Sequence, residues 1–448
     1  MKKLSLNFMA QIYLLENEFN RVCLVKNTSF SMVRLLFLKY VTDNFIGAET
    51  KGDIECFARL QKQFATSDVG GGPNLIIPVL DCVDRRYNLN GLLNKTVNDY
   101  AKELFGLDDS WSRKSASLND FEDIMNSLSK IDLEEIDENE KGKYVVKTLL
   151  ENMQRDSLSN RIVSNFISRF ELGEIAREIL MVNDNETFID FAAGVGSTTF
   201  AIVNDNYSNI KNYDVDKDSL SIFAMLSIMN GYKNFKVKCE DTLSNPDFIE
   251  KANKIFVDLP VNTKIANLRF GMKTESSLIA TEKTIDCLLD NGIGVITSNS
   301  NPLYSNTGSN VEIKKHIIEN RYLQAVISLP FTWVGSVANI NIIVVSKKIN
   351  KGVLFVNCNN KLPNSYVSED KDKGIVISKE GLKYIGNIIK NNSEIDNISR
   401  LVSYQEIDKN NYNLMPNTYI KDQFEVEQIT IEEIDLKLKE LYAQLGIK

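Results

Sequence analysis

Residues Thr187 to Phe200 read TFIDFAAGVGSTTF and indicate the class of fold. A short apolar run reaches an acid at Asp190, passes through a turn of small residues and continues into a helix-like segment. This pattern predicts a strand, a glycine-rich turn and a helix. Gly194 and Gly196 leave the backbone open to a ligand, and Asp190 falls where open α/β sheets bind ligands. Such turns also serve plain strand-to-helix packing, so this one does not establish a site by itself.

The residues that follow predict strands alternating with helices, which is typical of a parallel sheet. Seven strands are expected, at residues 187–189, 210–214, 235–239, 255–258, 294–298, 324–329 and 340–346. Asp214 closes the second strand, Asp241 follows the third and Asp258 closes the fourth. Carboxylates after the second and third strands can accept hydrogen bonds from two ribose hydroxyls and from an adenine amino group. A single strand-end aspartate is common in turns, but four in register favour a cofactor that contains a nucleoside.

The chain before this sheet has helical periodicity. Phe30 to Ile46 predicts a long amphipathic helix, with Arg34 and Lys39 on its solvated face. Further helices are expected at residues 92–104, 118–128, 143–153 and 162–180. After the sheet, residues 352–358 predict another strand. Residues 431–445 predict a terminal helix with near-heptad leucines, which either joins a coiled coil of a partner or folds back on its own domain.

Length, charge and cysteine usage restrict the functional classes. A chain of 448 residues is expected to form two or more domains. Its net charge of −8 has the wrong sign for a protein that grips nucleic acid unaided, so a basic partner or a local basic groove would be needed. Six scattered cysteines without a CxxC pair and a single histidine argue against structural zinc and a histidine-based triad. No apolar run reaches the span of a bilayer, so a cytoplasmic protein is expected. No bound metal is expected either.

Several motifs resemble the modification (methylation) subunits of type I restriction-modification systems, which are adenine-N6 DNA methyltransferases. DFAAGVGSTTF at residues 190–200 is similar to the family's DPACGSGGF loop, which holds S-adenosylmethionine. NYDVDKDSLSIFAMLSIMNGY at residues 212–232 resembles the segment after the second strand. LLFLKYVTDNF at residues 35–45 and EIDKNNYNLMPNTYI at residues 406–420 resemble further family segments. The resemblance covers nearly the whole chain.

The resemblance implies an α/β fold, with a Rossmann-like, seven-stranded S-adenosylmethionine-dependent methyltransferase domain and an N-terminal all-helical domain. The implied boundaries are 1–165 for the helical domain, 166–358 for the methyltransferase-like domain and 359–448 for a C-terminal region with a helical tail for subunit contact. It also implies cofactor contacts at Asp190, Ala192, Gly194, Gly196, Asp214 (ribose) and Asp241 (adenine). The implied partners are DNA, reached through a specificity subunit, a second copy of the chain and a nuclease subunit.

The family's catalytic tetrapeptide is Asn or Asp, then Pro-Pro, then an aromatic residue, and it falls here on Asp258-Leu259-Pro260-Val261. Asp258 can accept a hydrogen bond from the amine of a flipped-out adenine, and Pro260 keeps one of the two rigid positions. Val261 cannot stack on the base, a contact worth about 1–3 kcal/mol. A segment that covers the methionine end of the cofactor in the family falls on Phe170 to Gly173, where the match is poor.

Three functions are therefore open. The leading one is transfer of a methyl group from S-adenosylmethionine to adenine N6 in DNA. The second is a catalytically impaired scaffold or regulatory subunit in a DNA-acting complex, favoured by the altered tetrapeptide. Phe331 and Trp333, which follow the sixth strand, supply either a replacement stack for the base or ordinary packing. The third is methylation of RNA or protein, against which the resemblance of the helical region to the family's DNA-embracing domain argues.

Overall fold

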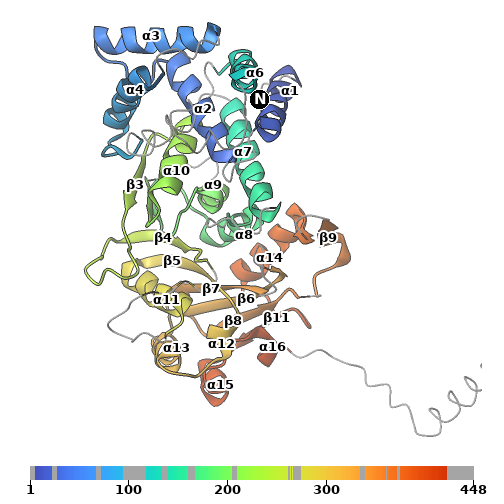
Figure 1. Cartoon of the computed structure of the whole chain (residues 1–448). Helices are drawn as coiled ribbons and strands as arrows, with labels where there is room; N and C mark the ends of the chain where they lie inside the picture. The colour runs from blue at the N-terminus through green and yellow to red at the C-terminus, as the bar shows by residue number, and fades with distance from the viewer. Residues whose placement is uncertain are drawn as a thin grey trace, which may run out of the picture.

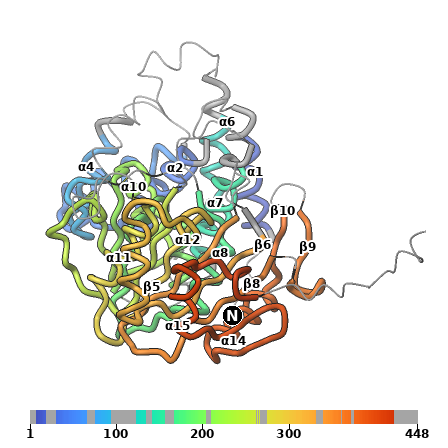
Figure 2. Tube along the Cα trace, turned by 90° about the horizontal axis from the view of Figure 1, so that it is seen from below, coloured from blue at the N-terminus to red at the C-terminus, as the bar shows by residue number. Residues whose placement is uncertain are grey.

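The computed structural model describes residues 6–22, 28–66, 72–93, 118–133, 140–159, 167–203, 209–260, 263, 265, 274–332, 339–359, 361–370 and 374–420. Helices make up the N-terminal part, and a large mixed sheet with its covering helices makes up the rest (Figure 1). In the view from below, the blue helices α1, α2 and α4 lie on the opposite side of the picture from the red α15 (Figure 2). The expected division into a helical part followed by an α/β part is confirmed.

The described strands form a nine-stranded sheet in the order β11-β8-β6-β7-β5-β4-β1-β2-β3. Their bounds are β1 Thr187–Asp190, β2 Asn209–Asp214, β3 Phe235–Cys239, β4 Ala252–Val257, β5 Leu288–Ser298, β6 Leu323–Thr332, β7 Asn339–Ser346, β8 Val353–Asn357 and β11 Ser399–Val402. Strands β3, β2, β1, β4 and β5 run parallel, and β7 is antiparallel to both β5 and β6. All seven expected strands are present. Strands β8 and β11 extend the sheet beyond them, and β11 was not predicted.

The N-terminal helices share one continuous apolar core with the sheet domain. Their bounds are α1 Leu6–Val22, α2 Thr28–Asp43, α3 Lys51–Thr66, α4 Gly72–Tyr87, α6 Leu118–Ser129 and α7 Glu140–Ser159. The predicted solvated face of α2 is wrong, because Arg34 and Lys39 are both buried. Lys39 pairs with Asp43, and the guanidinium of Arg34 lies 3.9 Å from the carboxylate of Asp218 on the sheet domain. Arg34 thus lies at the junction with the sheet domain, whereas Lys39 is paired within α2.

The remaining helices cover the sheet. Their bounds are α8 Phe170–Leu180, α9 Ser197–Val203, α10 Lys217–Met229, α11 Ser276–Cys287, α12 Asn301–Tyr304, α13 Asn310–Glu319, α14 Lys379–Asn391, α15 Tyr404–Lys409 and α16 Pro416–Tyr419. Helix α8 begins later than predicted, because Arg169 has an extended backbone. Helix α11 ends at Cys287, because Leu288 already pairs with Ala252 of β4. The predicted helix at residues 431–445 and most of that at 92–104 lie outside the described residues.

The described part of the C-terminal region is joined to the main sheet. β11 pairs with β8, and α14 packs closely on α8, where a Cβ on Gly386 would lie 2.6 Å from the Cβ of Glu178. A small antiparallel pair, β9 Val367–Asp370 and β10 Gly374–Ile377, precedes α14. The domain boundaries given above therefore stay a prediction.

Candidate cofactor and catalytic site

Three strand-end acids lie side by side at one edge of the sheet. In the registered pairs, Asp190 lies opposite Phe256 of β4 on one side and Asn212 of β2 on the other. Asp258 and Asp214 lie two residues further along those neighbouring strands. The charges of Asp258 and Asp214 both raise the pKa of Asp190, as expected for neighbouring carboxylates. The strand order reverses between β1 and β4, which is where open α/β sheets form their ligand crevice.

Asp190 is fully buried and holds the beginning of the glycine-rich turn. The backbone N–H of Ala192 donates to its Oδ1 at 3.1 Å, and the hydroxyl of Thr199 on α9 donates to its Oδ2 at 2.7 Å. Burial raises the pKa of Asp190 to about 7, although these two hydrogen bonds lower it. Asp190 therefore fixes the turn from inside. Thr199 was missed in the sequence, where it resembles any polar residue in a first helical turn.

Replacing Asp190 with Asn is expected to alter how stability depends on pH. The ordinary pKa is 3.8, and the folded value is about 7, so the folded chain keeps a proton that the unfolded chain releases. The resulting stabilisation is complete below pH 4 and is lost as pH rises through 7, a change of about 4 kcal/mol. Asn does not titrate, so the Asp190→Asn variant lacks this loss. Its melting temperature should therefore rise relative to that of the wild type as pH increases from 4 to 8.

Thermal unfolding followed by circular dichroism measures this difference. Asp184→Asn is the matched control, because Asp184 is exposed in the turn before the same strand. A difference in melting temperature between Asp190→Asn and the wild type that stays constant from pH 4 to 8 would contradict the assigned protonation.

The two glycines of the turn have different surroundings. Gly194 has φ +53°, and a Cβ built there meets no atom within 4 Å. Gly196 has φ +87°, and a Cβ there would lie 2.2 Å from the buried ring of Phe223. Gly194 thus leaves open space beside the turn, whereas Gly196 is required by packing against α10.

Asp214 lies at the end of β2, next to the open side of the turn. The N–H of Gly194 donates to its Oδ2 at 2.8 Å, and the N–H of Asp216 donates to its Oδ1 at 2.9 Å. Burial raises the pKa of Asp214, and these backbone hydrogen bonds oppose the rise. Each carboxylate oxygen can accept a second hydrogen bond, so the pair remains able to receive two hydroxyls.

Asp241 follows β3 and is exposed. Its Oδ1 accepts from the N–H of Ser244 at 2.9 Å, so the side chain closes a turn. The preceding residue, Glu240, donates its N–H to the carbonyl of Asp214 at 3.0 Å, which keeps Asp241 beside the end of β2. The hydrogen bond of Asp241 to Ser244 is equally consistent with a role in the turn and with a contact to adenine. The adenine-binding role of Asp241 therefore stays a prediction.

Asp258 is buried immediately after β4. The hydroxyl of Thr297 on β5 donates to its Oδ1 at 2.5 Å. Burial raises the pKa of Asp258 to about 6, while hydrogen bonding by Ser168 and Thr297 lowers it. Pro260 is exposed, and its carbonyl accepts from the N–H and the hydroxyl of Thr263.

Sequence reasoning missed Thr297 and Ser168, which both act on Asp258. Thr297 carries a usable signal, because it is a polar residue at the end of an apolar strand. Ser168 lies two residues before the poorly matching segment that begins at Phe170. Within that segment, a Cβ on Gly173 would lie 2.6 Å from the Cβ of Ala201, so this glycine serves the packing of α8 on α9. Val261 lies outside the described residues.

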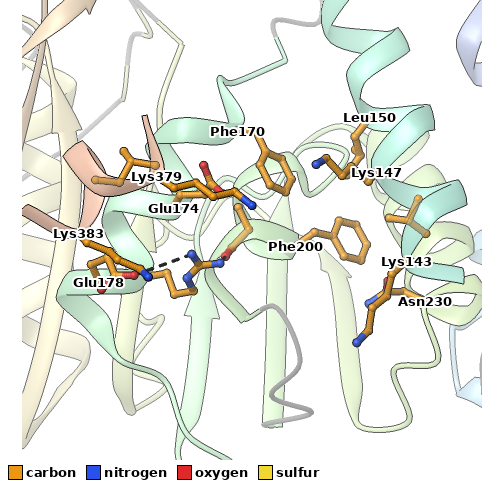
Figure 3. Close-up of a pocket in the computed structure, with 14 residues that line it drawn as sticks. Lys143, Lys147, Leu150, Phe170, Glu174, Glu178, Phe200, Asn230, Lys379 and Lys383 are labelled. Atoms are coloured by element: carbon orange, nitrogen blue, oxygen red, sulfur yellow. Dashed lines mark hydrogen bonds and ion pairs between the residues drawn. The ribbon is translucent and has the colours of Figure 1, made fainter. Parts of the chain in front are cut away.

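A cavity of about 430 Å³ lies away from these acids, between α7, α8, α9 and α14. Figure 3 shows Lys379 and Lys383 on one wall, Lys147 and Leu150 on the other and the ring of Phe200 between them. None of the strand-end acids lines this cavity, so it is not the predicted site. It lies where the helical part meets the sheet domain.

Among the described residues, no cluster of His, Cys, Asp or Glu could hold a metal ion, and no helix is long and apolar enough to cross a bilayer.

The fold is similar to solved subunits of restriction-modification systems. The methyltransferase subunit of a type I system from Streptococcus thermophilus matches 93% of this chain and 99% of its own, with 16% identity and a TM-score of 0.69. A modification subunit of a proposed type I restriction enzyme from Vibrio vulnificus matches 89% of this chain and 92% of its own, with 12% identity and a TM-score of 0.63. These likenesses confirm the predicted methyltransferase fold.

Sequence comparison identifies the family. The methylase subunit of the type I restriction enzyme MjaVIII from Methanocaldococcus jannaschii is 24% identical over 307 residues, which is 61% of this chain. The match spans 52% of that relative, about half its length. The N-6 DNA methylase family model matches residues 170–428, more than half of the chain. The chain therefore belongs to the N-6 DNA methylase family.

Proposed function

We propose that this chain transfers a methyl group from S-adenosylmethionine to the N6 atom of adenine in DNA. The observation that carries the proposal is the convergence of Asp258, Asp190 and Asp214 at the ends of three adjacent strands, beside the open space at Gly194. Membership of the N-6 DNA methylase family supports the same reaction and implies the same cofactor.

The residues present fit S-adenosylmethionine. Asp214 would receive the two ribose hydroxyls, the open face of Gly194 would admit the cofactor against the backbone, and Asp241 would receive the adenine amine. Asp190, Ala192 and Gly196 would act by holding the turn in shape. When bound, S-adenosylmethionine supplies an electrophilic methyl group on a positively charged sulfur.

Asp258 would hold the substrate amine. Its carboxylate can accept a hydrogen bond from the N6 amine of an extruded adenine, which directs the nitrogen lone pair toward the incoming methyl. Thr297 fixes the orientation of Asp258, and burial keeps bulk water from competing for its oxygens. Pro260 restricts the backbone of the following turn. Positioning of the two reactants would provide much of the rate acceleration.

The partners follow from charge and from the relatives. With a net charge of −8, the chain would need help with the phosphates of DNA, and a specificity subunit can supply it. The relatives are subunits of type I systems, so we also propose assembly with a second copy of the chain and with a nuclease subunit. A chain that acts on DNA with this cofactor is expected in the cytoplasm.

Replacing Asp214 with Ala is expected to weaken S-adenosylmethionine binding by roughly a hundredfold, because two hydrogen bonds to a charged group are lost. Asp214→Asn keeps one acceptor and should give an intermediate affinity. Isothermal titration calorimetry of the full chain measures both.

Asp184→Ala is the control for this titration, since Asp184 is exposed before the amino end of β1. Either no binding by the wild type or equal affinities of the wild type and Asp214→Ala would remove the cofactor assignment.

The altered tetrapeptide favours a second candidate, a scaffold or regulatory subunit that has lost methyl transfer. Leu259 replaces a proline and Val261 replaces the aromatic residue that stacks on the base in the family. This candidate predicts cofactor binding without methyl incorporation, whereas the enzyme requires both.

A further inference from the structure

The carboxyl edge of the sheet continues beyond Asp258 as a row of buried polar side chains. Ser298 of β5 lies opposite Asn341 of β7, Asn341 opposite Ser328 of β6, and Ser328 opposite Asn357 of β8. All four are buried, although the neighbouring positions on β6, β7 and β8 are apolar. Buried polar groups cost stability unless they are hydrogen-bonded, so apolar residues would suit a purely structural edge better.

The row is held by its own hydrogen bonds. The hydroxyl of Ser328 donates to Oδ1 of Asn341 at 2.6 Å, and Nδ2 of Asn341 donates to the hydroxyl of Ser300 at 3.2 Å. Oδ1 of Asn357 accepts from the N–H of Asn359 at 3.1 Å. These contacts fix the amides in defined orientations before any ligand arrives, which is how specific polar sites are built.

Two members of this row, Ser328 and Asn357, line a cavity of about 340 Å³. Its described lining consists of hydrogen-bonding side chains together with one methionine: Ser300, Ser328, Asn339, Asn357, Asn359, Lys361, Met415 and Asn417. No carboxylate is among them, although the chain as a whole is acidic. Met415 and Asn417 belong to the NLMPNTY segment, to which the proposed reaction assigns no role.

The chemistry of this lining suits a nucleotide. An asparagine amide donates and accepts at once, so it can pair with the edge of a base, most directly with that of adenine. The flexible thioether of a methionine packs against flat apolar surfaces, and a lysine ammonium attracts a phosphate. The volume lies within the range of small-ligand sites.

The cavity also lies at the right place for DNA. The hydroxyl of Thr297 donates a hydrogen bond to Asp258, and the first residue of the row, Ser298, directly follows Thr297. The row therefore begins beside the proposed catalytic aspartate. Ser328 lies on β6, three strands from β4, which corresponds to roughly 14 Å at the usual strand spacing. This distance equals about four base steps along a DNA strand, so the cavity would lie near the target base without overlapping it.

We propose that this cavity, lined by Asn357, Asn359, Asn417, Met415 and Lys361, is a subsite for a DNA nucleotide about four steps from the target adenine. The proposal rests on the proposed function, since it requires that DNA be the substrate. It assigns a substrate contact to the NLMPNTY segment, which reaches the edge of the sheet through α16.

The double variant Asn359→Ala/Asn417→Ala tests the proposal. We expect its affinity for a fluorescently labelled DNA oligonucleotide rich in adenine to fall about tenfold or more, because two base-edge contacts are lost. The complex of the full chain with its specificity subunit is titrated in the presence of S-adenosylmethionine, and fluorescence anisotropy reports binding. Calorimetry with S-adenosylmethionine should give the wild-type affinity, because neither asparagine lies near the glycine-rich turn.

The matched control is Asn185→Ala/Asn391→Ala, which removes two exposed amides from the turn before β1 and the end of α14. Equal DNA affinity of the cavity variant and the wild type, an equal loss in the control, or no oligonucleotide binding by the wild type would overturn the subsite. If the wild type did not bind S-adenosylmethionine, the proposed function would be overturned instead. Failure of the subsite and failure of the proposed function are therefore distinguishable.

Discussion

Asp258→Ala is expected to reduce methyl transfer to DNA by about a hundredfold or more, because removing one aligned hydrogen-bonding group from a reaction centre has an effect of this size. The variant loses the acceptor for the adenine amine, but it keeps the turn at Gly194 and the carboxylate of Asp214. S-adenosylmethionine affinity should therefore stay close to that of the wild type. Incorporation of labelled methyl groups into DNA by the complex with its specificity subunit measures the rate.

Asp258→Asn is the matched control for this experiment, since the amide keeps an acceptor oxygen and the family tetrapeptide itself begins with Asn or Asp. It should retain more activity than Asp258→Ala. The pKa of Asp258 is raised to about 6 by burial, so wild-type activity should fall as pH drops through 6 and the carboxylate is protonated. Asp258→Asn should lack this fall. Equal methyl incorporation by wild type and Asp258→Ala would show that Asp258 has no part in the reaction.

Gly196→Ala is expected to destabilise the chain by about 4 kcal/mol, a strong effect for one methyl group. The new Cβ would lie 2.2 Å from the ring of Phe223, which is fully buried and cannot move aside, and φ is +87°. The melting temperature should fall by roughly 10 °C. Thermal unfolding without ligand measures the loss.

Gly194→Ala is the counterpart in the same turn. Its Cβ would meet no atom within 4 Å, so the melting temperature should fall by only a few degrees. The methyl group would, however, occupy the space proposed for the cofactor, and S-adenosylmethionine affinity should fall. If both variants lost the same stability, the division of roles between the two glycines would be wrong.

Local patterns predicted much of this fold. The apolar run that ends at Asp190 and the glycines after it specify a strand, a turn and a helix, because these residue types restrict the backbone wherever they occur. The acids at 214 and 258 could be placed at one edge because the carboxyl ends of parallel strands meet there. Strand β11 was missed, since four residues beside a longer neighbour carry little periodic signal.

Other features depend on which segments meet, and periodicity does not report this. Arg34 and Lys39 have the spacing of a solvated helix face, yet α2 is covered where it meets the sheet domain. The partners of Asp258 come from residues 168 and 297, far from it along the chain. The amide row of β5, β7, β6 and β8 exists only because strand register brings single polar residues side by side.

The sequence by itself determined the class of fold, the position of the glycine-rich turn and the edge at which the acids gather, because each follows from backbone preferences of neighbouring residues. The tertiary structure alone decided that Gly194 faces open space while Gly196 faces a ring, and that Asp190 is buried deeply enough to hold a proton near neutral pH. The physical reason is that burial and side-chain contact are set by residues distant in the chain, whose arrangement depends on the packing of the whole sheet.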